Sequence, residues 1–306
     1  MFKEKFQEGI ISARDFSRDD IEYILAKSRK MMDHEKNAEL LRGKILATLF
    51  FEPSTRTRLS FESAMYRLGG NVIGFQSGDV SSIKKGESIA DTIRTVENYS
   101  DCIVMRHPLE GAAKMASRFA KIPIINAGSG SGEHPTQALL DLLTITEEGL
   151  KLDGLNIGIM GDLKYGRTVH SLAVLLSNYD THLYFISPKD LMLRNRDKEF
   201  LRQSQIKFKE VIQYRDILGI LDILYVTRIQ RERFADIEEY ERVKNFYVFN
   251  EEDLAKTKDN FKIMHPLPRI NEIVPEIDSS PKAIYFKQTY YGIPMRKALL
   301  SELLAD

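Results

Sequence analysis

Short apolar runs alternate along the chain with longer stretches in which apolar residues recur every three or four positions. A continuous apolar run of roughly four to eight residues is typical of a parallel strand that is buried on both faces. The wider spacing is typical of a helix with one buried side. The runs that we interpret as strands span 44–51, 71–75, 102–105 and 122–126 in the first half, and 155–160, 182–187, 223–226 and 261–264 in the second.

Three of the predicted helices have recognisable boundaries. Ser17 and Asp20 have the spacing of a capping box and open a helix over 17–32. A helix over 59–70 stops at a glycine pair, and the last helix, 294–304, has Pro294 in its first turn, where a missing N–H group is tolerated. The buried faces that we expect contain Ile21, Ile24, Leu25, Ser28 and Met32 in the first helix, Phe61, Met65 and Leu68 in the second, and Met295, Leu299 and Leu303 in the third.

Strands separated by helical patterns predict an α/β protein, because parallel strands need crossover connections. A chain of 306 residues has the length of two domains. The segment 147–154 is polar and contains two glycines, so we place the boundary there. We therefore predict two open parallel-sheet α/β domains, 1–148 and 149–291, with a C-terminal helix over 292–306 that completes the first domain.

The composition excludes several classes of protein. Lys plus Arg and Asp plus Glu number 44 each, which argues against a general nucleic-acid or membrane-surface binder, because such proteins need a basic field. No run approaches the ~20 apolar residues of a membrane helix. The single cysteine, Cys102, rules out an internal disulfide and suits the reducing cytoplasm, where we expect the protein. The N-terminal segment has no signal-peptide pattern.

The junction FFEPSTRTRLSFE at 50–62 contains the first candidate site. If a strand ends there and a helix begins near Ser54, unpaired backbone N–H groups and the positive end of the helix dipole meet at this point. Such a helix start suits an anion. Ser54 could serve only as a helix cap, with the arginines solvated. Two arginines and three hydroxyl groups within 54–58 favour a phosphate site instead, because a guanidinium matches phosphate geometry.

Two further strand ends in the first half carry polar side chains. The run at 102–105 leads into Arg106 and His107, and the run at 122–126 leads through a glycine-rich loop to His134 at the start of an apolar helix. Ligands of open α/β sheets bind outside the carboxyl ends of the strands. Arg106 could instead pair with a carboxylate, His134 could be a cap or core histidine, and the loop GSGSG could be a plain turn. Their shared placement predicts a pocket for a phosphate and a neighbouring polar group.

The second half repeats this arrangement. Arg167 and Arg228 follow predicted strands, and two arginines can each hold one carboxylate of a dicarboxylate substrate. Salt bridges between the domains are the alternative reading. The segment HPLPR at 265–269 ends another strand, and its two prolines lack N–H groups, so it presents mainly carbonyl acceptors. It is either a rigid loop or an acceptor for an NH2 group. No Walker loop and no HExxH spacing occurs, and we expect neither a metal nor a cofactor.

These segments together resemble the aspartate carbamoyltransferase catalytic chain, within the aspartate/ornithine carbamoyltransferase superfamily. They occur in the family's order from residue 44 to the C-terminal helix. The segments that carry the resemblance are FFEPSTRTRLSFE, KKGESIADTIRT, MRHP, GSGSGEHPTQALLDL, GDLKYGRTVHSL, VTRIQRERF and HPLPR. The resemblance implies transfer of the carbamoyl group of carbamoyl phosphate to L-aspartate, in pyrimidine biosynthesis, at an active site between the two domains.

The resemblance also implies a role for each matching residue. Carbamoyl phosphate would be held by Ser54, Thr55, Arg56, Thr57, Ser81, Arg106, His134, Gln137 and the carbonyl groups of Leu267 and Pro268, the bond between these last two being cis in the family. Aspartate would be held by Lys85, Arg167, Arg228 and Gln230. The residues implied to act in catalysis are Arg56, Thr57, Lys85, Arg106 and His134. Glu52, Arg167 and Arg233 match a network that closes the two domains on each other.

Ser81 and Lys85 match residues that reach the active site of a neighbouring subunit, which implies a homotrimer. The polar segment 76–88 has no apolar periodicity, and long loops of this kind are often functional. A solvated loop would have the same composition. The family occurs both with and without separate regulatory chains, and the sequence leaves that choice open.

Two other functions remain as alternatives. Ornithine carbamoyltransferase shares the phosphate motif and the fold, but its pattern has His-Cys-Leu-Pro where this chain has His265-Pro266-Leu267-Pro268, and its Asp-x-x-x-Ser-Met-Gly loop is absent here. Arg167 and Arg228 also favour a dicarboxylate over a cationic amino acid. The other alternative is a non-catalytic anion-binding module, and intact matches at each chemical position argue against it.

Overall fold

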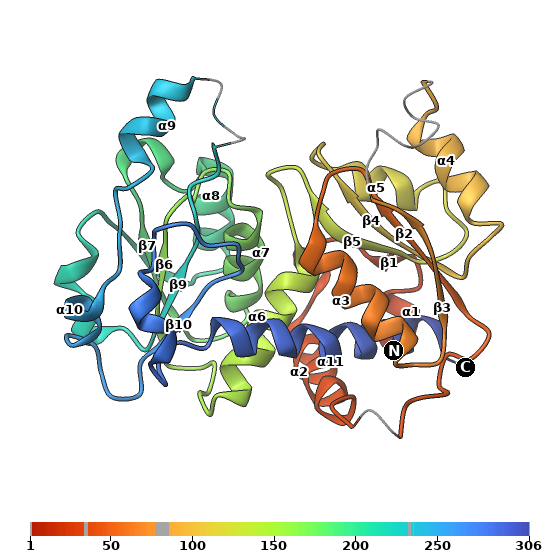
Figure 1. The fold of residues 1–306 in the computed structure, drawn as a ribbon, viewed down its shortest axis with the longest axis horizontal. Coiled ribbons are helices and arrows are strands. Elements are labelled where there is room, and N and C mark those ends of the chain that lie inside the picture. The colour runs from red at the N-terminus through yellow and green to blue at the C-terminus, as the bar shows by residue number, and fades with distance from the viewer. Residues whose placement is uncertain (1, 34–35, 77–85, 232–233, 235, 306) are drawn as a thin grey trace. The chain divides into compact units, whose positions relative to one another are not determined.

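The computed structural model describes residues 2–33, 36–76, 86–231, 234 and 236–305 (Figure 1). They form two compact units, Met1–Leu143 with Tyr290–Asp306, and Thr144–Thr289. The chain leaves the first unit within helix α6 (Pro135–Glu147) and returns to it within helix α11 (Tyr285–Leu304). No helix in the described ranges is both long and apolar enough to cross a membrane.

The first unit is built on a five-stranded parallel sheet with the order β1-β5-β4-β2-β3. Four of its strands are the predicted apolar runs, and β1 was missed because two residues are too short for a pattern. The strands are β1 (Gly9–Ile10), β2 (Ile45–Phe50), β3 (Asn71–Phe75), β4 (Cys102–His107) and β5 (Ile124–Ser129). The helices are α1 (Phe2–Lys5), α2 (Arg18–Lys30), α3 (Thr55–Tyr66), α4 (Ile89–Val96) and α5 (Ala112–Ser117), with a 3-10 turn at Ala13–Asp15.

Side-chain alternation along β2, β4 and β5 gives the middle of the sheet two buried faces. Ala47, Leu49, Ile103 and Met105 point to one face, where they form a cluster with Ile93 of α4 and with alanines of α5. Figure 1 shows α4 and α5 on that side of the sheet and α3 on the other. The burial on both sides explains why β2, β4 and β5 are continuous apolar runs rather than alternating ones, whereas β3, at the edge of the sheet, is exposed or half-buried.

The predicted start of the first helix and most of the predicted buried residues are confirmed, but the helix predicted over 59–70 begins earlier, at Thr55, and ends at Tyr66, before the glycine pair. The Ser17 hydroxyl accepts the N–H of Asp20, and the Asp20 carboxylate accepts the N–H of Ser17, so the capping box is complete. Ile21, Ile24, Leu25 and Ser28 are buried as expected, whereas Met32 is half-buried. Phe61, Met65 and Leu68 are fully buried under the sheet. Each such side chain contributes about 1.5–3 kcal/mol of hydrophobic stabilisation relative to exposure.

The second unit is a second five-stranded parallel sheet, with the order β10-β9-β6-β7-β8. Its strands are β6 (Asn156–Met160), β7 (His182–Ile186), β8 (Lys207–Val211), β9 (Ile223–Val226) and β10 (Lys262–Met264). Its helices are α7 (Arg167–Leu176), α8 (Asn195–Gln203), α9 (Ile237–Val243) and α10 (Glu251–Leu254), with 3-10 turns at Lys189–Leu191, Tyr214–Asp216, Leu218–Ile220 and Pro275–Ser279. The molecule therefore contains two α/β domains, as predicted.

Strand β8 was not predicted, and its position explains why. It pairs only with β7 at the edge of the sheet, and its residues are exposed or half-buried. Its sequence KFKEV contains three charged residues among five, and charged side chains on an edge strand disfavour pairing with another chain. The strand therefore has no continuous apolar run that would predict it.

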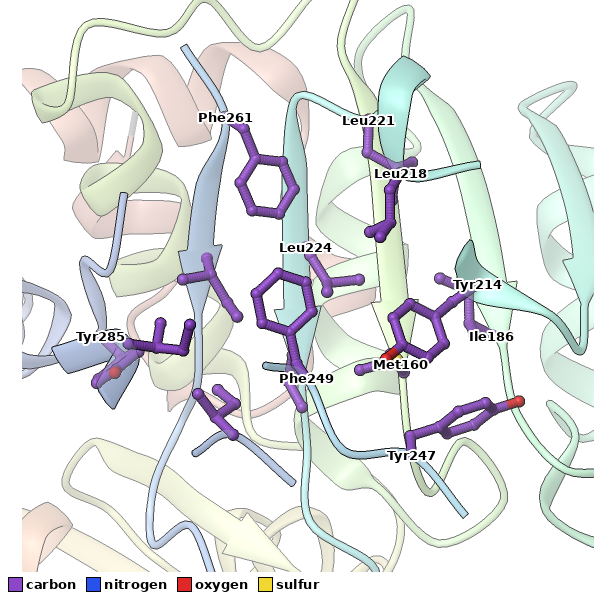
Figure 2. Close-up of a cluster of buried hydrophobic side chains, with 14 residues drawn as sticks. Met160, Ile186, Tyr214, Leu218, Leu221, Leu224, Tyr247, Phe249, Phe261 and Tyr285 are labelled. Carbon is purple, nitrogen blue, oxygen red and sulfur yellow. The ribbon is translucent and has the colours of Figure 1, made fainter. Parts of the chain in front are cut away.

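One large buried cluster of the second unit lies on one face of its sheet. Figure 2 shows the rings of Phe249 and Phe261 beside Leu224, with Leu218, Leu221 and Tyr214 in the same layer. The two phenylalanine rings are stacked, with their centroids 6.2 Å apart. This cluster holds β9 and β6 in place, so the loops at the carboxyl ends of these strands stand on a rigid base.

The prediction for the last helix was wrong about its start. Helix α11 begins at Tyr285, so Pro294 lies inside the helix instead of in its first turn. An internal proline removes one backbone hydrogen bond. The buried side chains of Met295, Leu299 and Leu303 beyond the proline were predicted correctly. Packing along the whole segment overrides the local signal of the proline.

Candidate functional site

The strand order of the first unit creates a crevice between β2 and β4. From β2 the chain passes to β3 on one side, and the next strand, β4, lies on the other side of β2. Connections that leave in opposite directions open a crevice at the carboxyl ends of the two strands, where ligands of such sheets bind. Phe50 is paired with Arg106 in this register. The segment 51–57 and the end of β4 are therefore neighbours, as the shared placement of their polar residues predicted.

Helix α3 begins at Thr55 with Ser54 in the cap position, but the Ser54 side chain makes no capping hydrogen bond. The simple capping role that the sequence left open is thus not the role of this hydroxyl group. Thr57 is buried, while Arg56 is exposed. Helix α3 spans 12 residues and follows β2 after a short turn, so its first-turn N–H groups and the positive end of its dipole are at this junction. The junction has the components of an anion site.

The two arginines of this junction behave differently. The Nε of Arg58 donates to Glu62 Oε1 of its own helix at 2.6 Å, and its Nη1 donates to Gln76 Oε1, just after β3, at 2.8 Å. Arg56, two residues earlier, lies in the first turn of the helix. Of the pair that suggested a phosphate site, only Arg56 has the position for it.

Arg106 is paired with a carboxylate, as one interpretation of the sequence allowed. Its Nε donates to Glu52 Oε1 at 2.8 Å, and the two side chains are only 15% and 19% exposed. Glu52 lies two residues after the end of β2, so this ion pair bridges the two strand ends that border the crevice. The sequence resemblance linked Glu52 to Arg167 and Arg233, and its partnership with Arg106 was not predicted. Arg233 lies outside the described residues.

The glycine-rich loop after β5 is a defined turn that brings His134 to this edge of the sheet. The N–H of Gly130 donates to the carbonyl of His107 at the end of β4, at 2.9 Å. Gly130 has φ +52°, and a Cβ atom there would lie 2.6 Å from the backbone N of Glu110, so the turn needs glycine. His134 is buried directly before α6. Gln137, in the first turn of α6, donates from Nε2 to Asp141 Oδ1 at 2.8 Å.

The second unit has the same kind of crevice, between β6 and β9. Connections from β6 lead to β7 and β8 on one side, and β9 lies on the other side of β6. Gly161 follows β6 with φ +123°, and a Cβ atom there would lie 2.0 Å from the carbonyl oxygen of Thr227. Arg167 is the first residue of α7 and is largely buried, and Arg228 follows β9. Both arginines therefore border one crevice.

The loops after β6 and β9 are also bonded to each other. Gln230 Nε2 donates to the carbonyl of Tyr165 at 3.5 Å. Asp162, which was not predicted as a site residue, lies fully buried in the first of these loops and accepts the N–H of Tyr165 at 2.9 Å. Burial raises the pKa of Asp162 to about 6, although hydrogen bonds from backbone N–H groups of both loops lower it. The only sequence signal for this role is a carboxylate placed directly after an apolar strand.

His170 of the same region has a structural role. Its Nδ1 faces Arg194 Nη2 at 2.9 Å, and its Nε2 lies 2.8 Å from the carbonyl of Leu163. Since a guanidinium only donates, Nδ1 is the acceptor, and the ring proton sits on Nε2 and is donated to the carbonyl. The imidazole thus ties α7 to the loop that precedes it.

The segment HPLPR follows β10 and forms a tight loop. The Leu267–Pro268 peptide bond is cis, as the resemblance implied, and Leu267 has φ +56°. The N–H of Leu267 donates to His265 Nδ1 at 2.8 Å, and His265 Nε2 lies 2.7 Å from Glu272 Oε1. The rigid-loop interpretation is therefore correct, and it is compatible with an acceptor role for the carbonyl groups.

The remaining predicted site residues, Ser81 and Lys85, lie outside the described residues. Within the described part of the chain, no group of three or more His, Cys, Asp or Glu side chains is placed to hold a metal ion. The predicted residues thus divide into one set at the β2/β4 crevice and another at the β6/β9 crevice with its neighbouring β10 loop.

Comparison with known proteins shows what class of protein carries these sites. The family model "Aspartate/ornithine carbamoyltransferase, carbamoyl-P binding domain" matches residues 9–147, and the model "Aspartate/ornithine carbamoyltransferase, Asp/Orn binding domain" matches residues 153–303. The chain belongs to the aspartate/ornithine carbamoyltransferase family.

The individual relatives point to one branch of that family. The aspartate carbamoyltransferase catalytic subunit of Thermococcus gammatolerans is 58% identical over 294 residues, which cover 95% of this chain and 96% of the relative. The solved catalytic subunit of M. jannaschii aspartate transcarbamoylase is 51% identical with a TM-score of 0.88, over 97% of each chain. Trypanosoma cruzi aspartate transcarbamoylase, solved with carbamoyl phosphate and aspartate, is 39% identical with a TM-score of 0.92, over 99% of this chain and 97% of that one.

Proposed function

We propose that the chain transfers the carbamoyl group of carbamoyl phosphate to the amino group of L-aspartate, giving N-carbamoyl-L-aspartate and phosphate. This is an aspartate carbamoyltransferase reaction and belongs to pyrimidine biosynthesis. The observation that carries the assignment is the full-length similarity to aspartate carbamoyltransferase catalytic subunits, 58% identical in one case. The polar residues at the β2/β4 and β6/β9 crevices are of the types that the two substrates require.

The β2/β4 crevice is the proposed site of carbamoyl phosphate. The free N–H groups of a helix start and the hydroxyl groups of Ser54, Thr55 and Thr57 suit the phosphate, with Arg56 as a cationic donor. Arg106, His134 and Gln137 are the proposed partners of the carbamoyl end. Support comes from the Ser54 hydroxyl, which does not cap the helix, and from the pairing that holds Arg106 at the strand end.

The β6/β9 crevice is the proposed site of aspartate. Arg167 and Arg228 each offer a planar fork of donors that fits one carboxylate group. Gln230 adds a side-chain amide, whose Nε2 donates to the carbonyl of Tyr165. The carbonyl groups of Leu267 and Pro268 are the proposed acceptors for the NH2 group of the carbamoyl moiety.

In the proposed mechanism, the deprotonated amine of aspartate attacks the carbamoyl carbon. Negative charge then develops on the carbonyl oxygen, where Thr57, Arg106 and His134 stabilise it as preorganised donors. The C–O bond to phosphate breaks, and the departing phosphate accepts the amine proton. Holding both substrates in reacting geometry contributes several kcal/mol, with ~7–11 kcal/mol for ideal cases.

The direct test measures carbamoylated product from carbamoyl phosphate with aspartate and, in parallel, with ornithine. We expect turnover of carbamoyl phosphate with aspartate and none with ornithine. Turnover with ornithine alone would overturn the aspartate assignment and leave the carbamoyl-phosphate site standing. Phosphate binding without turnover of either amino acid, in the presence of carbamoyl phosphate, would favour a non-catalytic module.

We further propose that three copies of the chain form the working unit, with Ser81 and Lys85 completing the site of a neighbouring subunit. The name "catalytic subunit" carried by the relatives supports partner chains of a regulatory kind. Mixing Lys85→Ala and Arg106→Ala variants under conditions that exchange subunits tests the shared site. Activity well above that of either variant is expected, because some mixed sites regain both residues. No recovery of activity would contradict a site shared between subunits.

The cytoplasmic location of the protein stays a prediction.

A further inference from the structure

Residues 265–272 form a loop whose two ends are joined by a buried pair. His265 is 1% exposed and Glu272 is 7% exposed, and the two side chains meet at 2.7 Å between Nε2 and Oε1. We propose that His265 and Glu272 are positioning residues that hold the carbonyl groups of Leu267 and Pro268 toward the NH2 group of carbamoyl phosphate, and thereby select it over acyl phosphates without that group. This inference rests on the proposed function.

The imidazole of His265 has a defined orientation because both of its nitrogens are engaged. The N–H of Leu267 donates to Nδ1 at 2.8 Å, so Nδ1 is an acceptor and the ring proton is on Nε2. Nε2 therefore donates to the Glu272 carboxylate. The backbone N–H of His265 in turn donates to Gln288 Oε1 at 3.0 Å, which fixes the start of the loop to α11.

Leu267 needs this anchor because its backbone conformation is unfavourable. It has φ +56°, in the left-handed region, which costs an L-residue with a branched side chain about 1–2 kcal/mol. The bond from its N–H group to His265 offsets that cost and sets the direction of the adjoining peptide groups. Without this acceptor, the peptide group that carries the Leu267 N–H could rotate.

Glu272 fixes the far end of the loop in the same way. Its Oε2 accepts the backbone N–H groups of Ile270 and Asn271, each at 3.1 Å, while its Oε1 accepts from His265. Burial raises the pKa of Glu272, but these hydrogen bonds outweigh burial and leave the pKa below its usual value. An ionised carboxylate only accepts, so it suits three converging donors.

The arrangement makes the segment 266–268 an acceptor-only surface. Pro266 and Pro268 have no N–H groups, and the N–H of Leu267 is used by His265. A ligand that meets this backbone finds carbonyl oxygens alone. An NH2 group satisfies them and a methyl group does not, and a site built to bond such a group can reject an analogue without it by ~10⁴-fold or more. Acetyl phosphate differs from carbamoyl phosphate by this group alone.

Two substitutions separate the two contacts of the imidazole. In His265→Asn the side-chain oxygen replaces Nδ1 and still accepts the N–H of Leu267. In His265→Gln the side-chain amide replaces Nε2 and still donates to Glu272, but Leu267 loses its acceptor. The measurement is kcat/KM for carbamoyl phosphate and for acetyl phosphate, each with saturating aspartate, and the ratio of the two. Ile270→Ala, at an exposed side chain of the same loop, is the matched control.

We expect His265→Gln to lower the ratio about 10-fold or more, chiefly through carbamoyl phosphate, and His265→Asn to keep most of it. Glu272→Gln replaces one of the two acceptor oxygens with an NH2 group, so either His265 or the two backbone N–H groups lose their acceptor. It should lower the ratio as well and provides a second variant if His265→Gln does not fold. A fall in both reactions by the same factor, or an unchanged ratio in folded variants, would overturn the positioning role. Absence of carbamoyl-phosphate turnover in the unsubstituted chain would instead refute the proposed function.

Discussion

Replacement of Arg106 by alanine tests the carbamoyl-phosphate site most sharply. The change removes a charged donor from the end of β4 and leaves Glu52 Oε1 without the hydrogen bond from Arg106 Nε at 2.8 Å. Loss of one preorganised donor to a developing oxyanion costs about 2.7–4 kcal/mol in the barrier. Since each 1.36 kcal/mol is a factor of ten, we expect kcat to fall by about 10²–10³-fold.

The same substitution should cost much less in stability. The Glu52 side chain is 19% exposed, so water can reach it once Arg106 is gone. The full penalty for an orphaned buried charge, about 3–5 kcal/mol, is therefore an upper limit, and we expect about 1–2 kcal/mol. For a unit of this size, that corresponds to a shift of Tm by several degrees. Steady-state turnover and thermal unfolding of the same preparation measure both effects.

Arg58→Ala is the matched control for this experiment. It breaks an arginine–glutamate pair of similar burial, at 2.6 Å between Arg58 Nε and Glu62 Oε1, on helix α3 of the same unit. We expect a comparable change in Tm and a change in kcat of less than about threefold, because this guanidinium is tied along its own helix. Near-normal turnover of Arg106→Ala, or equal losses of kcat in both variants, would refute the reasoning.

Three further predictions follow from individual residues. His134→Ala should keep the fold and lose most of kcat, and turnover close to that of the unsubstituted enzyme would contradict its role. Gly161→Ala should destabilise the second unit by more than about 2 kcal/mol in urea unfolding, because its Cβ would lie 2.0 Å from a backbone oxygen, whereas Gly149→Ala, with open space around it, should cost only about 1 kcal/mol. Burial raises the pKa of Asp253, but hydrogen bonds, with that from Arg215 foremost, outweigh burial and leave the pKa below its usual value. The contribution of Asp253 to stability is therefore present above the unfolded pKa of about 3.9 and is lost as pH falls through the folded pKa. The stability difference between the unsubstituted chain and Asp253→Asn should therefore shrink as pH drops below about 4, and a constant difference would contradict the assignment.

Most of the fold could be read from the sequence, because burial on both faces of a parallel strand imposes a local pattern. The eight apolar runs all became strands. The strands that were missed are β1, which is too short, and β8, whose edge position leaves it exposed. The start of α11 was misjudged because proline is a local signal, whereas the burial of Tyr285 and Met295 on either side of it depends on distant partners.

The sequence alone determined which segments carry the chemistry. Hydroxyl groups, arginines and prolines are concentrated directly after the apolar runs, and this local pattern is visible in the amino-acid sequence. Only the tertiary structure decided how those ends are combined. Strand order places β2 beside β4 and β6 beside β9, and it pairs Glu52 with Arg106 across 54 positions of sequence. The pair of His265 and Glu272 likewise depends on how a loop closes. Such contacts arise from packing and hydrogen bonding between segments that are remote along the chain, and no local periodicity encodes them.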